Sequence, residues 1–196
     1  MFEDRSETWR VGIKRAEKAR GRSLAVLLQQ YDLFSEQLET TMAKVLEILE
    51  SIPGTAQMLS VPGVGVVTVA GFLAEVGDIH NYDHGQQIIR LAGLNLKENS
   101  SGKRKGRTGI SKRGRSRLRA LLFRAVMPMV AKNPAFKALH HYYTTRSQNP
   151  LKKKQSIIAL CGRLARILFT LGTKQKEYDA NDVMGPVRQA HMQVVA

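Results

Sequence analysis

The chain has 196 residues, of which 43% are hydrophobic, so it is long enough to bury a core in one or two domains. Its 31 Lys and Arg against 16 Asp and Glu give a formal net charge of +15, which indicates a polyanionic partner such as ribosomal RNA, DNA or an anionic surface. No apolar run approaches the ~18 residues of a membrane span, and the polar start does not resemble a signal peptide. We therefore expect a cytoplasmic protein with no membrane partner. The lone Cys161 excludes an internal disulfide and is predicted to be a buried core thiol, and the five His form no metal set.

Residues 1–22 are polar and basic, and we expect a flexible start there. A heptad pattern follows and predicts a coiled-coil helix over residues 23–53, which Pro53-Gly54 ends. One seam position is occupied by Leu24, Tyr31, Leu38, Val45 and Ile52, and the position three residues later by Leu27, Phe34, Thr41 and Ile48. The seam fits packing within its own chain and a coiled coil with another helix equally well.

Residues 55–172 are predicted to form a helical domain, and residues 173–196 a mobile tail. Gly and Pro positions and helix-capping residues set the predicted boundaries. In chain order we expect a short helix from Thr55 and then a helix over 66–74 that Gly77 caps, with a strand as the alternative for the second. A capping box of Asp83 and Gln86 opens the next helix, which ends near Gly93 and is followed by a loop over 95–114. A helix over 115–130, a helix begun by Asn133-Pro134 and, after Pro150, a last helix that Gly172 stops complete the domain. The predicted fold class is all-α.

The segment Val61-Pro62-Gly63-Val64-Gly65 has the helix-hairpin-helix pattern of hydrophobic-Pro-Gly-hydrophobic-Gly. Two glycines allow positive φ and a close approach of phosphate to the backbone. The next helix would present unpaired N–H groups and the positive end of its dipole. A glycine-rich turn without a ligand is the alternative. Together with the charge excess, the pattern favours contacts with the DNA backbone through Pro62, Gly63, Val64 and Gly65.

A second candidate site is a basic run that contains no acid over 17 residues. Nine like charges repel one another strongly unless phosphates neutralise them, so a nucleic-acid contact is favoured over a solvated loop. The candidate contact residues are Lys103, Arg104, Lys105, Arg107, Lys112, Arg113, Arg115, Arg117 and Arg119.

Ser101 precedes Gly102 at the start of this run. A serine hydroxyl is a poor nucleophile without a base, a metal or flanking cations, although the neighbouring cations could stabilise a pentavalent phosphorus. Most Ser-Gly pairs in basic loops are flexible linkers, so chemistry alone favours the linker here.

Several motifs in one order resemble the insertion-sequence transposases that a bridge RNA guides, the IS110/IS1111 group. The resemblance covers residues from about 11 to 171, including the segment 149–156. The motifs are Leu59-Ser60-Val61-Pro62-Gly63-Val64-Gly65, Phe72-Leu73-Ala74-Glu75-Val76-Gly77-Asp78, Ala92-Gly93-Leu94, Asn99-Ser100-Ser101-Gly102, Ile110-Ser111-Lys112-Arg113-Gly114 and Leu118-Arg119.

The resemblance implies DNA strand exchange through a covalent phosphoserine, with Ser101 as the nucleophile and Ser100 as the fallback. It also implies a guide RNA and an N-terminal RuvC-like domain whose four acids bind Mg²⁺. Because the sequence begins in the basic segment ahead of the heptads, we expect that domain to be missing and this chain alone to be inactive, with no cofactor of its own. We expect DNA as the partner and a homo-oligomer through residues 23–53. The alternative function is a non-catalytic helix-hairpin-helix binder of branched DNA or structured RNA.

Overall fold

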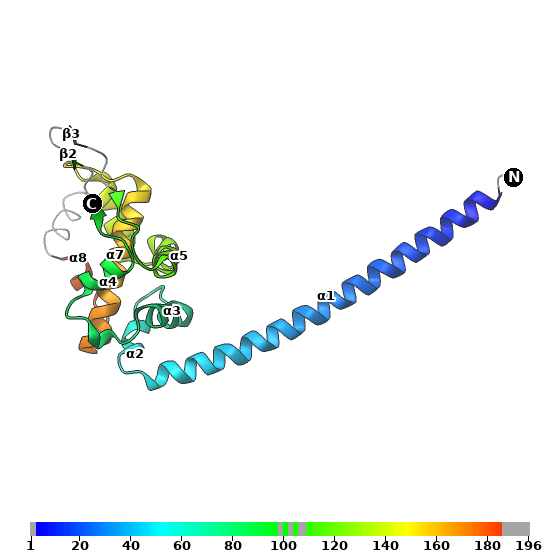
Figure 1. Cartoon of the computed structure of the whole chain (residues 1–196), viewed down its shortest axis with the longest axis horizontal. Helices are drawn as coiled ribbons and strands as arrows, with labels where there is room; N and C mark the ends of the chain where they lie inside the picture. Colours follow the sequence, from blue (N-terminus) through cyan, green and yellow to red (C-terminus); the bar gives the residue numbers. More distant parts are fainter. Residues whose placement is uncertain (1–2, 98–99, 102–103, 106–108, 186–196) are drawn as a thin grey trace. The chain divides into compact units, whose positions relative to one another are not determined.

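The computed structural model describes residues 3–97, 100–101, 104–105 and 109–185. The chain divides into two compact units, residues 1–47 and 48–196. The structure is mostly helical, which confirms the predicted all-α class, and its few strands are two residues long (Figure 1).

Helix α1 spans Glu3–Ser51. It already includes residues 3–22, where the sequence predicted a flexible start. This stretch is rich in Glu, Lys and Arg and contains no proline, so helix propensity allows the helix to continue toward the N-terminus.

The heptad seam of the first unit is exposed to solvent. Leu24, Leu27, Tyr31, Phe34 and Leu38 each expose between 59% and 70% of their surface. Among the described residues of the first unit, α1 is the only element, so nothing there covers them.

The second unit is a helical domain built around α7 (Lys153–Lys174), which packs most extensively against four other α-helices of the unit. These are α2 (Thr55–Leu59), α4 (Gly85–Leu91), α5 (Ser116–Lys132) and α6 (Pro134–Thr145). Helix α3 (Val66–Val76) packs on α5, and the short helices η1 (Ile79–Asn81) and α8 (Ala180–Met184) complete the domain. By length and composition α7 could cross a membrane, but more than half of its apolar stretch is buried inside the domain, as in the core helix of a globular protein.

Most predicted boundaries in this domain are confirmed. Residues 66–76 form a helix rather than a strand, and Gly77 caps it at φ 77°. Asn133 caps α6 and accepts from the N–H groups of Ala135 and Phe136 at 3.0 and 3.3 Å, with Pro134 in the first turn. These boundaries follow from local backbone chemistry alone.

Two predicted helix-end signals in the domain were wrong. Gly172 does not stop α7, because its missing side chain serves packing instead: a Cβ there would lie 2.2 Å from Met58 Cε and 2.7 Å from Ile79 Cδ1. The capping partner of Asp83 is Gln87, whose Oε1 accepts from the Asp83 N–H at 2.8 Å, and not Gln86. Within the predicted tail the structure forms the short helix α8 (Ala180–Met184), where Arg163 donates to the carbonyls of Asp182 and Val183.

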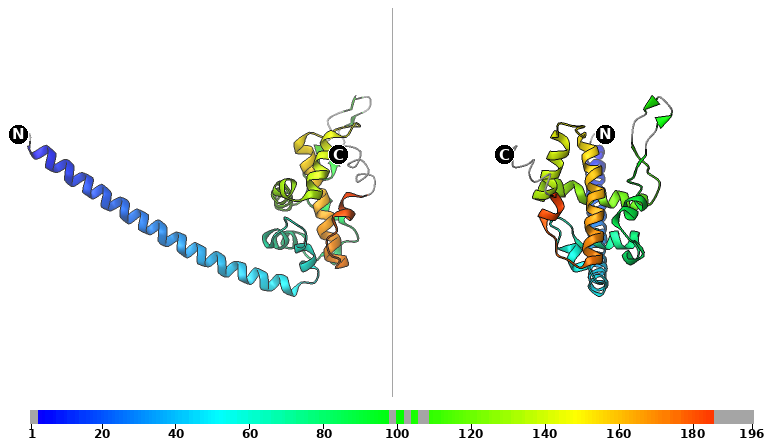
Figure 2. Two further views of the ribbon diagram at one scale, coloured as in Figure 1. Left: turned by 180° about the vertical axis from the view of Figure 1, so that it is seen from behind. Right: turned by 90° about the vertical axis from the view of Figure 1, so that its left-hand side faces the viewer.

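The predicted loop over residues 95–114 is a β-hairpin that projects from the helices (Figure 2). At its base β1 (Leu96–Lys97) pairs with β4 (Gly109–Ile110), and further out β2 (Ser100–Ser101) pairs with β3 (Arg104–Lys105), both antiparallel. The strands are too short to show the alternation by which a strand is recognised in sequence.

Candidate nucleic-acid interface

The turn between α2 and α3 contains the predicted helix-hairpin-helix pattern. Gly63 adopts φ 94°, a conformation that favours glycine, and the Val64 N–H donates to the Val61 carbonyl at 2.9 Å. Gly65 is extended at φ −108°, ψ 173° and forms the N-cap of α3. Pro62, Gly63 and Gly65 are exposed, whereas the side chains of Val61 and Val64 are 1% and 7% exposed and anchor the turn in the core. Val64 can therefore contribute only its backbone to a ligand.

Asn133 fixes the turn from the α5–α6 junction. Its Nδ2 donates to the Pro62 carbonyl at 2.9 Å while its Oδ1 caps α6, and the residue is only 2% exposed. The sequence identified Asn133 as a cap but gave no sign of the second bond, because its partner is 71 residues away. Helix α5 also packs against the turn, with Met129 Cγ 3.0 Å from where a Cβ of Gly63 would lie. Contacts from α5 and Asn133 therefore fix the geometry of the turn.

The open side of the turn presents backbone donors. The N–H groups of Gly65, Val66 and Val67 have no backbone acceptor among the described residues, as expected for the first turn of a helix. A Cβ on Gly65 would meet no heavy atom within 4 Å. An anion can therefore approach these donors at the positive end of the α3 dipole.

The base of the hairpin is rooted between α4 and α5 by backbone hydrogen bonds. The N–H groups of Lys112 and Arg115 donate to the carbonyls of Gly93 and Leu91 at 3.0 and 2.7 Å. Gly114, at φ 136°, leaves no room for a side chain, because a Cβ would lie 2.3 Å from the Leu91 carbonyl oxygen. The basic segment therefore starts from a fixed base and is not an unattached loop.

The register of the outer strands pairs Ser101 with Arg104 and Ser100 with Lys105. Both serines thus lie opposite a basic residue in a two-residue ladder. Lys103 and Arg107, both predicted contact residues, lie outside the described residues.

The remaining predicted cations at the hairpin base and the start of α5 fall into two groups. Lys112, Arg113 and Arg117 are exposed. Arg115 and Arg119 instead donate to main-chain carbonyls at the ends of α3 and α4, those of Glu75 and Ala92, the latter at 2.9 Å. These two arginines join elements of the fold, which sequence spacing could not reveal.

The described residues contain no group of three or more His, Cys, Asp or Glu placed to hold a metal ion. Cys161 is buried as predicted, and burial raises the pKa of its thiol to about 12, so the thiolate is not available for chemistry at neutral pH.

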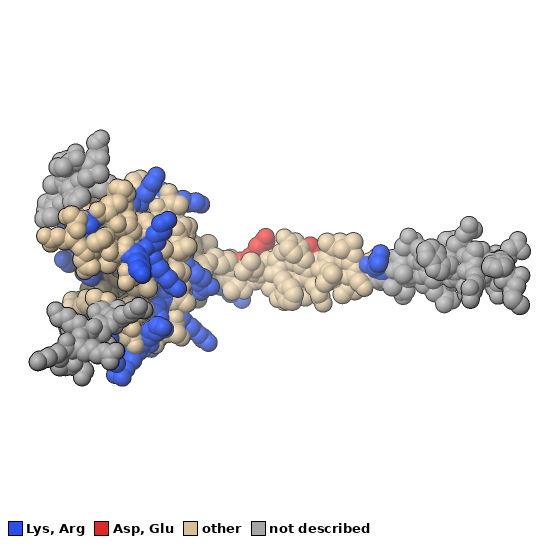
Figure 3. All heavy atoms as spheres, turned by 90° about the horizontal axis from the view of Figure 1, so that it is seen from above, with Lys and Arg blue, Asp and Glu red and all other residues tan. Residues whose placement is uncertain are grey.

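The acid-free basic stretch extends well beyond the 17-residue run identified in the sequence. Between residues 99 and 176 there are 20 Lys and Arg and no Asp or Glu. In the view of Figure 3, Lys and Arg side chains project from the helical domain, and no acidic side chain is visible on that face of it. Such a face produces a positive potential that attracts polyanions.

Comparison with known proteins relates this part of the chain to transposases. Residues 55–141, which contain the turn, the hairpin, α5 and most of α6, match the model of the Transposase IS116/IS110/IS902 family. The transposase for insertion sequence element IS1111A of Coxiella burnetii is 34% identical over 124 residues, which is 61% of this chain and 33% of that protein. The insertion element IS116 uncharacterized 44.8 kDa protein of Streptomyces clavuligerus is 26% identical over 161 residues, 82% of this chain and 38% of that protein.

The pilin gene-inverting protein of Moraxella bovis is 26% identical over 148 residues, 73% of this chain and 44% of that protein. The aligned part of this chain thus spans between about a third and less than a half of the length of these three relatives. Over residues 55–141 the chain is therefore similar to the transposase domain of the IS116/IS110/IS902 family.

Proposed function

We propose that this chain is the DNA-binding and nucleophile-bearing portion of a transposase that exchanges DNA strands. The observation that carries the proposal is that the family match over residues 55–141 includes both the turn with open N–H donors and the basic hairpin with Ser101. In this account Gly63 and Gly65 let a phosphate approach the α3 N-terminus, and Lys112, Arg113 and Arg117 contact neighbouring phosphates.

Ser101 is the proposed nucleophile, with Ser100 as the fallback. Its Oγ would attack a backbone phosphorus, so that an O–P bond forms to serine and the P–O bond to the leaving sugar oxygen breaks. Nearby cations such as Arg104, opposite Ser101 in the ladder, would stabilise the charge on the phosphorane. While they are charged they cannot accept the serine proton, so a base must come from elsewhere, and we expect the acid that protonates the leaving oxygen to come with it.

We expect those groups, with any bound Mg²⁺, in an acidic RuvC-like domain supplied in cis or in trans. A guide RNA binds to the same basic surfaces, and a homo-oligomer forms through the exposed seam of α1. The seam residues within 24–38 are large, apolar or aromatic, regularly spaced and exposed, which is typical of a coiled coil.

The test is a labelled DNA substrate separated under denaturing conditions. This chain incubated with DNA, guide RNA and Mg²⁺ should give no protein-linked band, and addition of an acidic partner domain should produce one. Ser101→Ala should abolish the band and leave DNA binding unchanged, whereas Ser100→Ala should preserve it. A strong adduct from this chain alone would disprove its catalytic dependence on a partner, and an adduct that survives Ser101→Ala would assign the nucleophile to another residue.

A further inference from the structure

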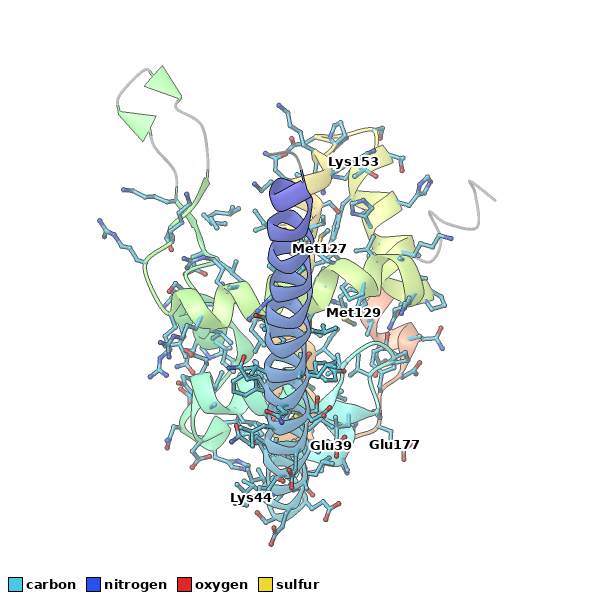
Figure 4. All side chains as sticks on the ribbon, turned by 90° about the vertical axis from the view of Figure 1, so that its right-hand side faces the viewer. Glu39, Lys44, Met127, Met129, Lys153 and Glu177 are labelled. Atoms are coloured by element: carbon cyan, nitrogen blue, oxygen red, sulfur yellow. The ribbon has the colours of Figure 1, made fainter. Side chains whose placement is uncertain are left out.

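A third basic surface lies where α6 turns into α7, away from both the turn and the hairpin base. Its charged members are Arg146 near the end of α6 and the run Lys152, Lys153 and Lys154 at the start of α7. We call these residues the α6–α7 basic surface. Figure 4 shows Lys153 at the end of the domain where α6 meets α7.

The turn that presents this surface is well fixed. The Leu151 N–H donates to the Tyr143 carbonyl at 2.8 Å, and Arg146 Nε donates to the Asn149 carbonyl at 2.9 Å. One turn further in, His140 Nδ1 and the fully buried Ser156 Oγ are hydrogen-bonded at 2.9 Å, which ties α6 to α7. The cations thus stand on an ordered scaffold.

The charges on this surface are uncompensated. The three lysines are exposed, and neither they nor Arg146 has an acidic partner within the described part of the chain. The next acid along the chain is Glu177, beyond the far end of α7, a helix of 22 residues and therefore ~33 Å long. Figure 4 likewise shows Glu177 far from Lys153.

Helix stability does not explain the lysines. A positive charge in the first turn opposes the helix dipole, and the first turn of α7 contains no acid. The positive field extends to His140, whose pKa is lowered by burial and then by Lys153 and His141. Arg146 also lies over the Tyr143 ring, at 5.9 Å from its centroid, and this cation–aromatic contact orients the guanidinium without neutralising its charge.

We propose that the α6–α7 basic surface binds the phosphodiester backbone of nucleic acid, as a contact additional to the turn and the hairpin. The inference rests on the proposed function, because it extends the same DNA or guide-RNA partner over a second part of the domain. In both views of Figure 2 the α6–α7 turn and the outer strands of the hairpin lie toward the same end of the domain, so one polyanion can reach both.

The test compares two double variants that remove the same charge from opposite ends of α7: Lys153→Gln/Lys154→Gln and, as matched control, Lys174→Gln/Lys176→Gln. Each is titrated by fluorescence anisotropy at several salt concentrations with a labelled DNA duplex and, separately, with an RNA hairpin. Loss of two phosphate contacts should reduce the slope of log affinity against log salt by about 1.8 for duplex DNA, and the control should leave it within about 0.5. Circular dichroism should show both variants folded, since Gln is a good helix former.

A change with DNA only assigns the surface to DNA, a change with RNA only assigns it to RNA, and a change with both assigns it to the shared backbone. Equal slopes for the two variants on both probes would overturn this inference and leave the proposed function standing. Failure of the unmodified chain to bind either probe would overturn both. Amine-reactive labelling provides a second readout, because bound nucleic acid should protect Lys153 and Lys154 but not Lys174 and Lys176.

Discussion

Replacement of Gly65 by alanine should separate DNA binding from folding. In the free protein the change is small, because φ −108° and ψ 173° are open to alanine and the new Cβ meets nothing within 4 Å. Alanine is a poorer N-cap than glycine, but it also reduces the entropy of the unfolded chain, so the free energy of unfolding should change by less than about 1 kcal/mol. Gly63→Ala cannot serve, because φ 94° and the approach to Met129 would destabilise the fold.

In the complex, a methyl group on Gly65 would occupy the space through which a phosphate reaches the α3 donors. Loss of one hydrogen bond to a charged group costs about 1.5–3 kcal/mol, which corresponds to a roughly 10- to 100-fold weaker affinity for duplex DNA. Anisotropy titration at fixed salt measures the affinity, and urea unfolding measures the stability. Val67→Ala is the matched control, because Val67 is 63% exposed in the first turn of α3 and its loss leaves the donors open. A folded Gly65→Ala protein that binds DNA as well as the unmodified chain would refute the assignment of phosphate to this turn.

Three further predictions concern the rest of the molecule. Leu38→Asp should give smaller species in sedimentation with helical circular dichroism retained, because a charge in an apolar interhelical seam is costly. The control Thr40→Asp should leave the assembly unchanged. Unfolding of Leu38→Asp without a prior change in assembly would mean that the seam packs within its own chain. Asn133→Ala should lower the free energy of unfolding by about 2–4 kcal/mol, because α6 loses its cap and the Pro62 carbonyl loses its donor. Asn133→Ser should restore the cap of α6 and so lose less stability. Equal losses for the two variants in urea unfolding would contradict the separate contributions of the cap and the Pro62 bond. Because the pKa of His140 is lowered in the fold, the unfolded state takes up the proton first as the pH drops. The free energy of unfolding should therefore fall below the usual pKa of 6.5 until the lower pKa of the folded state is reached. If His140→Gln shows the same decline in a pH profile of urea unfolding, His140 is not the source of this pH dependence.

The elements that could be predicted from sequence are those fixed by local chemistry. Asn133-Pro134 and Gly77 set helix ends through caps and dihedral preferences that involve only neighbouring residues. Gly172 failed as a helix stop because its role depends on Met58 and Ile79, which come from more than 90 residues earlier in the chain. A glycine inside a helix and a glycine after one look alike until the packing partner is known.

In the candidate site, too, features fixed by neighbouring residues were predicted and features fixed by distant contacts were missed. The turn at Pro62–Gly65 was located by its pattern, since its conformation depends on its own glycines. The hairpin was missed because its pairing depends on ends held by α4 and α5, and the bonds of Arg115 and Arg119 to distant carbonyls have no sequence signature. The position of Ser101 opposite Arg104 likewise followed only from the register of strands that the sequence predicted as a loop.

The salt dependence of binding tests most directly whether this chain binds nucleic acid through phosphates. Affinity for a DNA duplex, measured by anisotropy between ~50 and ~200 mM salt, should fall steeply and log-linearly, by on the order of 10³-fold if six phosphates are contacted. The variant Lys112→Gln/Arg113→Gln/Arg117→Gln, which spares the structural Arg115 and Arg119, should flatten the slope by up to about 2.7. Affinity that does not change with salt, or a slope that the triple variant leaves intact, would contradict the account.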